Sequence, residues 1–267
     1  MIINETYKLN DILDELVFTE QQAEIKIQGK INLTNLTKID PNLLQIGIDE
    51  AGRGPLLGSV VVGAVLLPSE LTGELEKLDL SPTPLTQLND SKKISEKKRN
   101  AIYQKLQEHA VAYVSVDMPA QVIDEINILQ ASLQGMRLAV RCLLANISKH
   151  IQPKNFNVEL LFDGNKLPKL DFSLYQQWGY DNKKIAPLAV VKGDSKFTSI
   201  ASASIIAKVE RDEQMYQLAK QYPQYGIEQH KGYPTKAHFL ALEEFGIIKN
   251  EHRQSFAPVR KLITQKV

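Results

Sequence analysis

The stretch LQIGIDEAGRGPLLGSVVVGAVLL spans residues 44–67 and decides the fold. Its first part, Leu44 to Asp49, predicts a β-strand. Its second part, Ser59 to Leu67, is apolar at almost every position, as expected of a strand that is covered on both faces. The glycine-rich turn between them is too short for a crossover connection, so the two strands must be antiparallel.

Strands and helices alternate through the rest of the chain. Three further strands are predicted at residues 110–116, 158–162 and 185–191, and helices at about 95–108, after Pro119 and from near Asp194. The last of these helices is apolar through residue 209, so we expect its first half to be buried, and its small residues would let it approach a sheet closely. The sequence therefore predicts an α/β fold with a mixed sheet flanked by helices.

The two ends of the chain give weaker patterns. Residues 1–41 show no sustained hydrophobic period, and we expect them to form a short N-terminal extension that is too small for a core of its own. Residues 42–267 are predicted to form the main domain, with an irregular tail beyond His252.

Composition limits the classes of function. With 43% hydrophobic and 24% charged residues among 267, the chain has the composition of an ordinary soluble globular protein. Its longest apolar run, residues 60–67, falls far short of the ~20 residues that cross a bilayer. The N-terminus has no secretory pattern, so we expect a cytoplasmic protein, and a monomer is the default. The lone Cys142 excludes an internal disulfide and a thiolate metal cage.

The net charge of +1 gives no general signal for nucleic acid, so a polyanion would have to bind a local patch. The segment Ser91–Arg99 is densely basic, and further lysines gather in the C-terminal half at positions 192, 196, 208, 231 and 236. A solvated helix face remains the alternative for such a run.

Acidic residues stand at the ends of three predicted strands. Asp49 and Glu50 end the first strand, Asp163 ends the fourth, and Asp194 follows the fifth. Ligands of α/β proteins gather outside the carboxyl ends of neighbouring strands, so we expect these four acids to converge. Converging carboxylates repel one another unless a cation intervenes, and Mg²⁺ or Mn²⁺ prefers such oxygen ligands. Each acid also has a structural alternative, as a helix N-cap, a turn residue or a surface acid.

Seven ordered motifs resemble one family. They are IGIDEAGRGPLLG, NDSKKISEKKR, NILQASLQGMRLAV, LLFDGN, VVKGDSKFTSIASASIIAKVERD, HKGYPTKAH and HRQSFAPV, and together they are similar to ribonuclease HII from about residue 44 to residue 259. The resemblance implies a ribonuclease H-like fold, with a mixed five-stranded sheet flanked by helices and a helical C-terminal part. It implies hydrolysis of RNA in RNA–DNA hybrid duplexes and incision 5′ to single ribonucleotides in duplex DNA, leaving 5′-phosphate and 3′-hydroxyl ends.

The resemblance also assigns roles to residues. The family's metal-site acids fall on Asp49, Glu50, Asp163 and Asp194, which would hold two divalent ions with Asp49 bridging them. Gly52-Arg53-Gly54 is suited to reading the ribose 2′-hydroxyl through its main chain, and Tyr233 matches the family tyrosine that packs against the sugar on the DNA side of the junction. The expected phosphate contacts are Ser91, Lys92, Lys93, Lys192, Lys196 and Lys231. The chain departs from the family at Leu57 and Ser59, and its first forty residues match no part of the family pattern.

Three other functions stay open on the sequence. A non-catalytic nucleic-acid-binding module could keep the fold, although the intact acidic set argues against it. A junction-resolving DNA nuclease could use the same acids. A nucleotide-binding protein could use AGRG as a phosphate loop, but that turn lacks the helix N-terminus that makes a good phosphate site.

Overall fold

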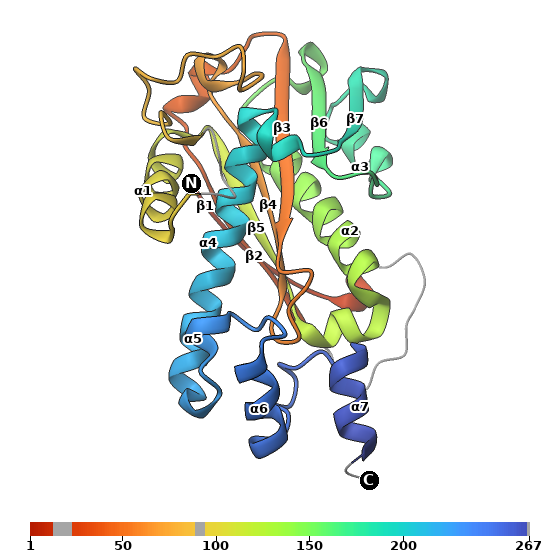
Figure 1. The fold of residues 1–267 in the computed structure, drawn as a ribbon. Helices are drawn as coiled ribbons and strands as arrows, with labels where there is room; N and C mark the ends of the chain where they lie inside the picture. Colours follow the sequence, from red (N-terminus) through yellow and green to blue (C-terminus); the bar gives the residue numbers. More distant parts are fainter. Residues whose placement is uncertain (13–22, 89–93, 266–267) are drawn as a thin grey trace.

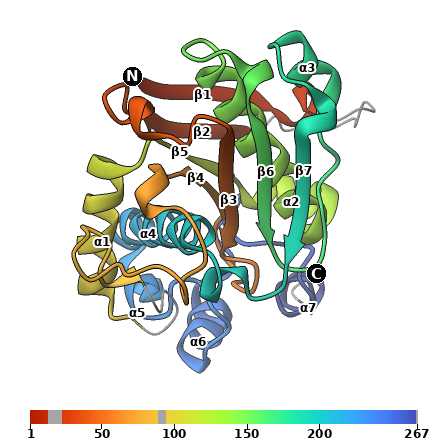
Figure 2. The same ribbon diagram turned by 90° about the horizontal axis from the view of Figure 1, so that it is seen from above.

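One seven-stranded sheet organises the protein. In the computed structural model, which describes residues 1–12, 23–88 and 94–265, the strand order is β1-β2-β5-β4-β3-β6-β7 (Figures 1 and 2). The strands are β1 (Ile2–Lys8), β2 (Glu24–Ile31), β3 (Leu43–Ala51), β4 (Val60–Leu66), β5 (Ala112–Met118), β6 (Asn157–Asp163) and β7 (Ile185–Val190).

The sheet is mixed, as predicted. β3 pairs antiparallel with β4, with Asp49 opposite Gly63. β6 and β7 run parallel to β3 on its other side. The carboxyl ends of β3, β6 and β7 therefore lie at the same edge of the sheet.

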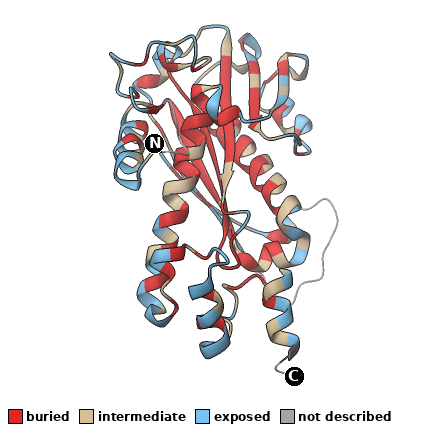
Figure 3. Cartoon of the chain, in the orientation of Figure 1, coloured by how far each residue is buried: buried red, intermediate tan, exposed pale blue. Residues whose placement is uncertain are grey.

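Helices cover both faces of the sheet. They are α1 (Glu96–His109), α2 (Ala120–Ile147), α3 (Phe172–Gln177), α4 (Thr198–Gln221), α5 (Ile227–His230), α6 (Lys236–Phe245) and α7 (Ala257–Gln265). α4 packs on β3 and β4 from one side, and α2 packs on β4 and β5 from the other. The core between these layers is buried throughout (Figure 3). None of the described helices combines the length and the apolar character that crossing a bilayer requires.

Two glycines allow α4 to lie directly against the sheet. A Cβ on Gly47 would stand 2.1 Å from the Ser199 carbonyl carbon, and one on Gly63 would stand 2.3 Å from the Ala203 carbonyl oxygen. The small residues of α4 complete this close contact, as the sequence predicted. The helix thus brings its side chains within reach of the carboxyl end of β3.

Three details differ from the prediction. The sheet has two more strands than the expected five, because β2 follows a period-two pattern in which Ile25 and Ile27 are fully buried, and β1 pairs with it. The helix expected from near Asp194 begins at Thr198, because Lys192 adopts a left-handed backbone and residues 193–195 form a separate 3₁₀ turn. The tail beyond His252 contains α7 rather than an irregular segment.

Removing residues 1–31 is expected to lower the stability of the protein. Deletion exposes the edge of β5, to which β2 is hydrogen-bonded, and removes the buried side chains of Ile25, Ile27 and Ile31. Burial of one such side chain is worth about 1.5–3 kcal/mol, partly offset by the entropy of ordering the segment, so we expect a net loss of a few kcal/mol. Urea denaturation measures the change, and an unchanged midpoint would contradict it.

Candidate active site

Three of the predicted acids meet at the carboxyl edge of the parallel strands. Ile48 of β3 pairs with Phe162 of β6, so Asp49 and Asp163 are the next residues along two neighbouring strands. Asp49 and Glu50 lie in β3, and Asp163 ends β6. The negative charge of Asp163 acts on both Asp49 and Glu50.

Asp49 is almost fully buried, with 3% of its surface exposed. Burial raises the pKa of its carboxyl group well above the usual value, and the charges of Glu50 and Asp163 raise it further. Its Oδ1 accepts a hydrogen bond from the Glu50 backbone N–H at 2.7 Å, and the Ser204 side chain of α4 also bonds to the carboxyl. A buried acid beside two others is a costly arrangement that a cation would relieve.

Glu50 has one paired and one unpaired oxygen. Its Oε1 lies 3.2 Å from Arg53 Nη1, whereas Oε2 is buried without a hydrogen-bond partner among the described residues. Burial raises the pKa of Glu50, and Arg53 partly opposes the shift. This buried Oε2 is therefore free to accept a ligand.

Asp163 and Asp194 are joined through the backbone. Asp163 Oδ1 accepts a hydrogen bond from the Gly193 N–H at 2.7 Å, which holds the 3₁₀ turn that carries Asp194 against the end of β6. Asp194 is 4% exposed. This backbone hydrogen bond brings the turn that carries Asp194 to the end of β6.

The four acids offer the donor set that a hard divalent cation takes. All are carboxylates, and the buried, unpaired Oε2 of Glu50 is available to a ligand. Within residues 1–12, 23–88 and 94–265, however, no three acidic, histidine or cysteine side chains lie close enough to form a metal site as they stand. Glu50 is paired with Arg53, and Asp163 accepts a hydrogen bond from the Gly193 N–H. The roles of the four acids as metal ligands remain predictions.

A cavity of about 350 Å³ opens beside Glu50. Its walls include the turn Gly52-Arg53-Gly54 and the ring of Tyr233, which are far apart in the sequence. Gly52 has a φ of +97°, which favours glycine, and a Cβ there would meet Arg211. A Cβ on Gly54 would lie 3.6 Å from the Tyr233 ring, and Tyr233 is 42% exposed. The sequence prediction that these four residues share one site agrees with this cavity, although their contact with substrate stays untested.

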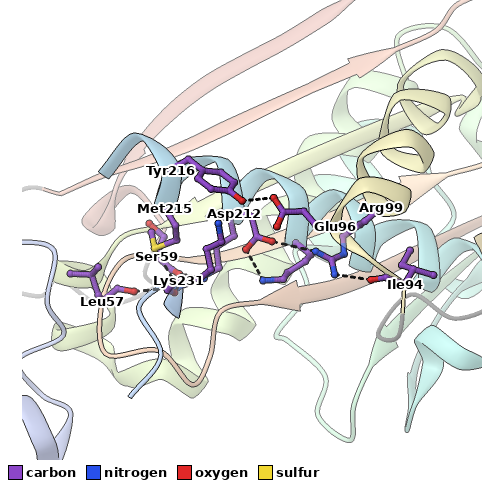
Figure 4. A network of polar contacts seen from close by, with 11 residues as sticks. Leu57, Ser59, Ile94, Glu96, Arg99, Asp212, Met215, Tyr216 and Lys231 are labelled. Carbon is purple, nitrogen blue, oxygen red and sulfur yellow. Dashed lines mark hydrogen bonds and ion pairs between the residues drawn. The ribbon is translucent and has the colours of Figure 1, made fainter. Parts of the chain in front are cut away.

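The predicted phosphate-binding lysines are spread more widely. Lys192 and Lys196 are exposed near Asp194 but do not line the cavity. Lys231 Nζ lies 3.1 Å from the centre of the Tyr216 ring and is buried without a hydrogen-bond partner in the described part of the chain (Figure 4). Burial lowers the pKa of Lys231. Ser91, Lys92 and Lys93 lie outside the described residues.

Two other cations line the cavity that sequence reasoning did not single out. Arg99 of α1 and Lys208 of α4 both bind Asp212, at 3.3 Å and 2.6 Å (Figure 4). Arg99 stands at the end of the basic segment, and Lys208 precedes Asp212 by one helical turn, a spacing that brings side chains together. Both cations belong to the basic stretches of the sequence, but only the spacing of Lys208 and Asp212 indicated a specific contact.

Three histidines support the loop that carries Tyr233. The Ile248 N–H donates to His252 Nδ1 at 2.8 Å, so the proton of the neutral ring sits on Nε2. That Nε2 lies 3.1 Å from His238 Nε2, which must accept, and His238 Nδ1 donates to the Tyr233 carbonyl at 3.0 Å. His230 stacks on His238 with ring centres 4.3 Å apart. Both linked rings must therefore be neutral for the chain of hydrogen bonds to persist.

Acid should weaken this histidine chain. Burial lowers the pKa of His238 to about 4 and that of His252 to about 3, the latter helped by His238. Both values lie below that of an unfolded histidine, so the unfolded chain binds more protons and stability falls as the pH drops from about 6.5 towards 4. Replacing His252 with Asn should reduce the dependence of the unfolding free energy on pH by about 1.4 kcal/mol per pH unit. Denaturation between pH 7 and 4.5 measures it, and equal slopes would contradict the neutral chain.

Comparison with known proteins places the chain in a family. The profile of ribonuclease HII matches residues 46–259. The chain is 47% identical over 255 residues to ribonuclease HII of Psychrobacter arcticus, covering 90% of this chain and 88% of the relative. It is 44% identical to ribonuclease HII of Polynucleobacter asymbioticus, covering 81% and 94%. This chain belongs to the ribonuclease HII family.

Solved structures show the same fold. The ribonuclease H2 of Pyrococcus horikoshii matches with a TM-score of 0.59 and 22% identity, covering 84% of this chain and 98% of that one. Bst-RNase HIII in complex with Mn²⁺ matches with a TM-score of 0.60 and 17% identity, covering 86% and 72%. As a ribonuclease HII, the chain is a hydrolase that cleaves RNA in RNA–DNA hybrids, and the family implies a divalent metal cofactor.

Proposed function

We propose that this ribonuclease HII incises duplex DNA on the 5′ side of single embedded ribonucleotides, as well as cutting longer hybrids, and leaves 5′-phosphate and 3′-hydroxyl ends. The observation that supports the proposal is the cavity that Glu50, at the end of β3, lines together with the turn Gly52-Arg53-Gly54 and the ring of Tyr233. Carboxylates can hold the metal ions that hydrolyse a phosphate ester. A glycine turn beside an aromatic ring can contact a sugar.

Asp49, Glu50, Asp163 and Asp194 would hold two Mg²⁺ or Mn²⁺ ions. Bound there, two such ions lower the pKa of a water and stabilise the departing 3′-oxygen. The chain's own contribution is to keep Asp49 buried and ionisable beside them, with Ser204 fixing the orientation of its carboxylate. Binding of a cation would also free Glu50 from Arg53, which is half exposed and could then turn to a phosphate.

Ribose selectivity is assigned to the turn and to Tyr233. Gly52 and Gly54 allow the backbone to approach the sugar closely, so that main-chain groups reach a 2′-hydroxyl that a side chain would block. The exposed ring of Tyr233 stands against Gly54, where it favours a deoxyribose on the far side of the junction. Arg99 and Lys208 supply positive charge to the same cavity, so binding should weaken with added salt.

The test uses three labelled duplexes: DNA with one embedded ribonucleotide, a long RNA–DNA hybrid and DNA alone, each with Mg²⁺ or EDTA. We expect metal-dependent cutting of the first two and none of the third. Cutting of DNA alone would favour a junction-resolving nuclease instead. A Tyr233→Ala variant should lose its preference for the junction, and an unchanged site preference would remove Tyr233 from the proposal. A cytoplasmic location and a monomeric state remain predictions.

A further inference from the structure

Two fully buried arginines contact the turn between β3 and β4, residues 52–59. Arg211 of α4 and Arg253, before α7, each have 0% of their surface exposed. In the part of the chain that the structure describes, neither forms an ion pair with a carboxylate. A buried cation without a counter-charge is costly unless hydrogen bonds compensate. Burial lowers the pKa of both groups, and their proximity lowers that of Arg253 further.

Arg253 donates three hydrogen bonds to backbone carbonyls of residues 52–58. Its Nη2 donates to the Gly52 carbonyl at 2.7 Å, its Nη1 to the Arg53 carbonyl at 3.1 Å, and its Nε to the Gly58 carbonyl at 2.8 Å. The turn that is proposed to read the sugar is thus held by three hydrogen bonds from one rigid guanidinium group.

These bonds set the direction of two peptide groups. In a trans peptide the N–H points opposite to the C=O, and the structure has no cis peptides among the described residues. Because the carbonyls of Gly52 and Arg53 face Arg253, the N–H groups of Arg53 and Gly54 point the other way. The cavity is lined by these residues and not by Arg253. No acceptor in the described ranges binds either N–H group, so both are available to a ligand.

Arg211 connects this turn to the loop that carries Lys231 and Tyr233. Its Nε donates to the Ser59 carbonyl at 3.2 Å, and its Nη2 donates to the carbonyls of Leu57 and Lys231 at 3.2 and 3.1 Å (Figure 4). Its guanidinium carbon lies 6.0 Å from the centre of the Tyr233 ring. The Leu56 N–H also donates to the Gly232 carbonyl at 2.8 Å. The buried side chain of Arg211 therefore links the turn and the Tyr233 loop, the two segments that are proposed to contact the sugar.

We propose that Arg253 is a positioning residue that aims the N–H groups of Arg53 and Gly54 at the 2′-oxygen of the ribonucleotide, with Arg211 fixing the distance to Tyr233. The proposal rests on the proposed function. It assigns the discrimination of ribose to a guanidinium that does not touch the substrate.

The test compares an embedded ribonucleotide with an embedded 2′-fluoro nucleotide, whose fluorine accepts hydrogen bonds poorly. Arg253→Lys keeps the charge but loses the planar fork. We expect it to reduce kcat/KM on the ribonucleotide by roughly 10- to 100-fold, as for other supporting residues, with little loss on the 2′-fluoro substrate. The exposed Arg260→Lys serves as the matched control and should change neither. Arg211→Lys should relax the preference for the junction more than the preference for ribose.

The outcomes separate the two proposals. If the wild type does not cut the duplex with the embedded ribonucleotide, the proposed function fails. If the wild type cuts that duplex, but Arg253→Lys slows cleavage of the ribonucleotide and 2′-fluoro substrates equally, the arginine is only structural and the inference is overturned. Should the variants not fold, amide exchange of the wild type decides. The Arg53 and Gly54 amides should exchange quickly in the free protein and become protected in the complex with ribonucleotide-containing duplex, and unprotected amides there would overturn the inference.

Discussion

An Asp49→Asn variant is expected to lose cleavage activity while it melts at a higher temperature than the wild type without metal. Asp49 is buried beside Glu50 and Asp163, so ionising it in the folded protein is unfavourable. Because its pKa is raised, the folded state binds this proton more tightly than the unfolded state does. The stability of the wild type therefore falls as the pH rises past the usual pKa of an aspartate. Asparagine removes that penalty at neutral pH.

The two effects can be measured separately. Loss of a metal-ligating charge should reduce kcat at least about 10³-fold, comparable to the removal of a major transition-state contact. Relief of the repulsion at Asp49 should raise the melting temperature, by about 2–4 °C for each 1 kcal/mol gained in a protein of this size. Added Mg²⁺ should stabilise the wild type and leave the variant unaffected. Asp79→Asn, on the exposed surface, is the control. Near-normal activity in saturating Mg²⁺ would exclude Asp49 as a ligand.

Gly47→Ala is expected to destabilise the protein strongly although it adds a single methyl group. The new Cβ would lie 2.1 Å from the Ser199 carbonyl carbon and 2.3 Å from the Ile200 nitrogen, and both belong to the backbone of α4. Backbone atoms cannot move aside as a side-chain end can, so α4 must shift from β3. Overpacking costs about 1–3 kcal/mol and more where nothing can relax, and we expect a loss of about 3 kcal/mol or more.

Gly54→Ala is the matched comparison for this change. Its Cβ would lie 3.6 Å from the Tyr233 ring, an ordinary contact, so stability should stay within about 0.5 kcal/mol while cleavage slows because the methyl group enters the cavity. Urea denaturation and initial rates distinguish the two variants. If Gly47→Ala were as stable as the wild type, the close contact between α4 and β3 would be wrong.

The central part of the fold was predictable because its signals are local. The apolar run of β4 and the short turn before it required an antiparallel pair, and the small residues of α4 indicated its close approach to the sheet. The convergence of Asp49 and Asp163 followed from acids at the ends of strands, since parallel strands end at one edge.

Other features depend on contacts that no local pattern reveals. β1 carries many polar residues and is held at the sheet edge by its pairing with β2. Lys231 is predicted to contact phosphate, and no sequence pattern indicated that the fold places its ammonium on the Tyr216 ring. Arg211 and Arg253 occurred in motifs without an assigned role, because the carbonyl groups that they bind lie in segments far away in the sequence.

The most direct test of the account is to map the cut in a duplex with one ribonucleotide at single-nucleotide resolution in Mg²⁺. The account predicts one nick, at the phosphate 5′ to the ribonucleotide, with a 3′-hydroxyl on the upstream fragment and a 5′-phosphate on the ribonucleotide. Cuts only within long hybrids, with the single ribonucleotide left intact, would contradict the roles given to Gly52-Arg53-Gly54 and Tyr233.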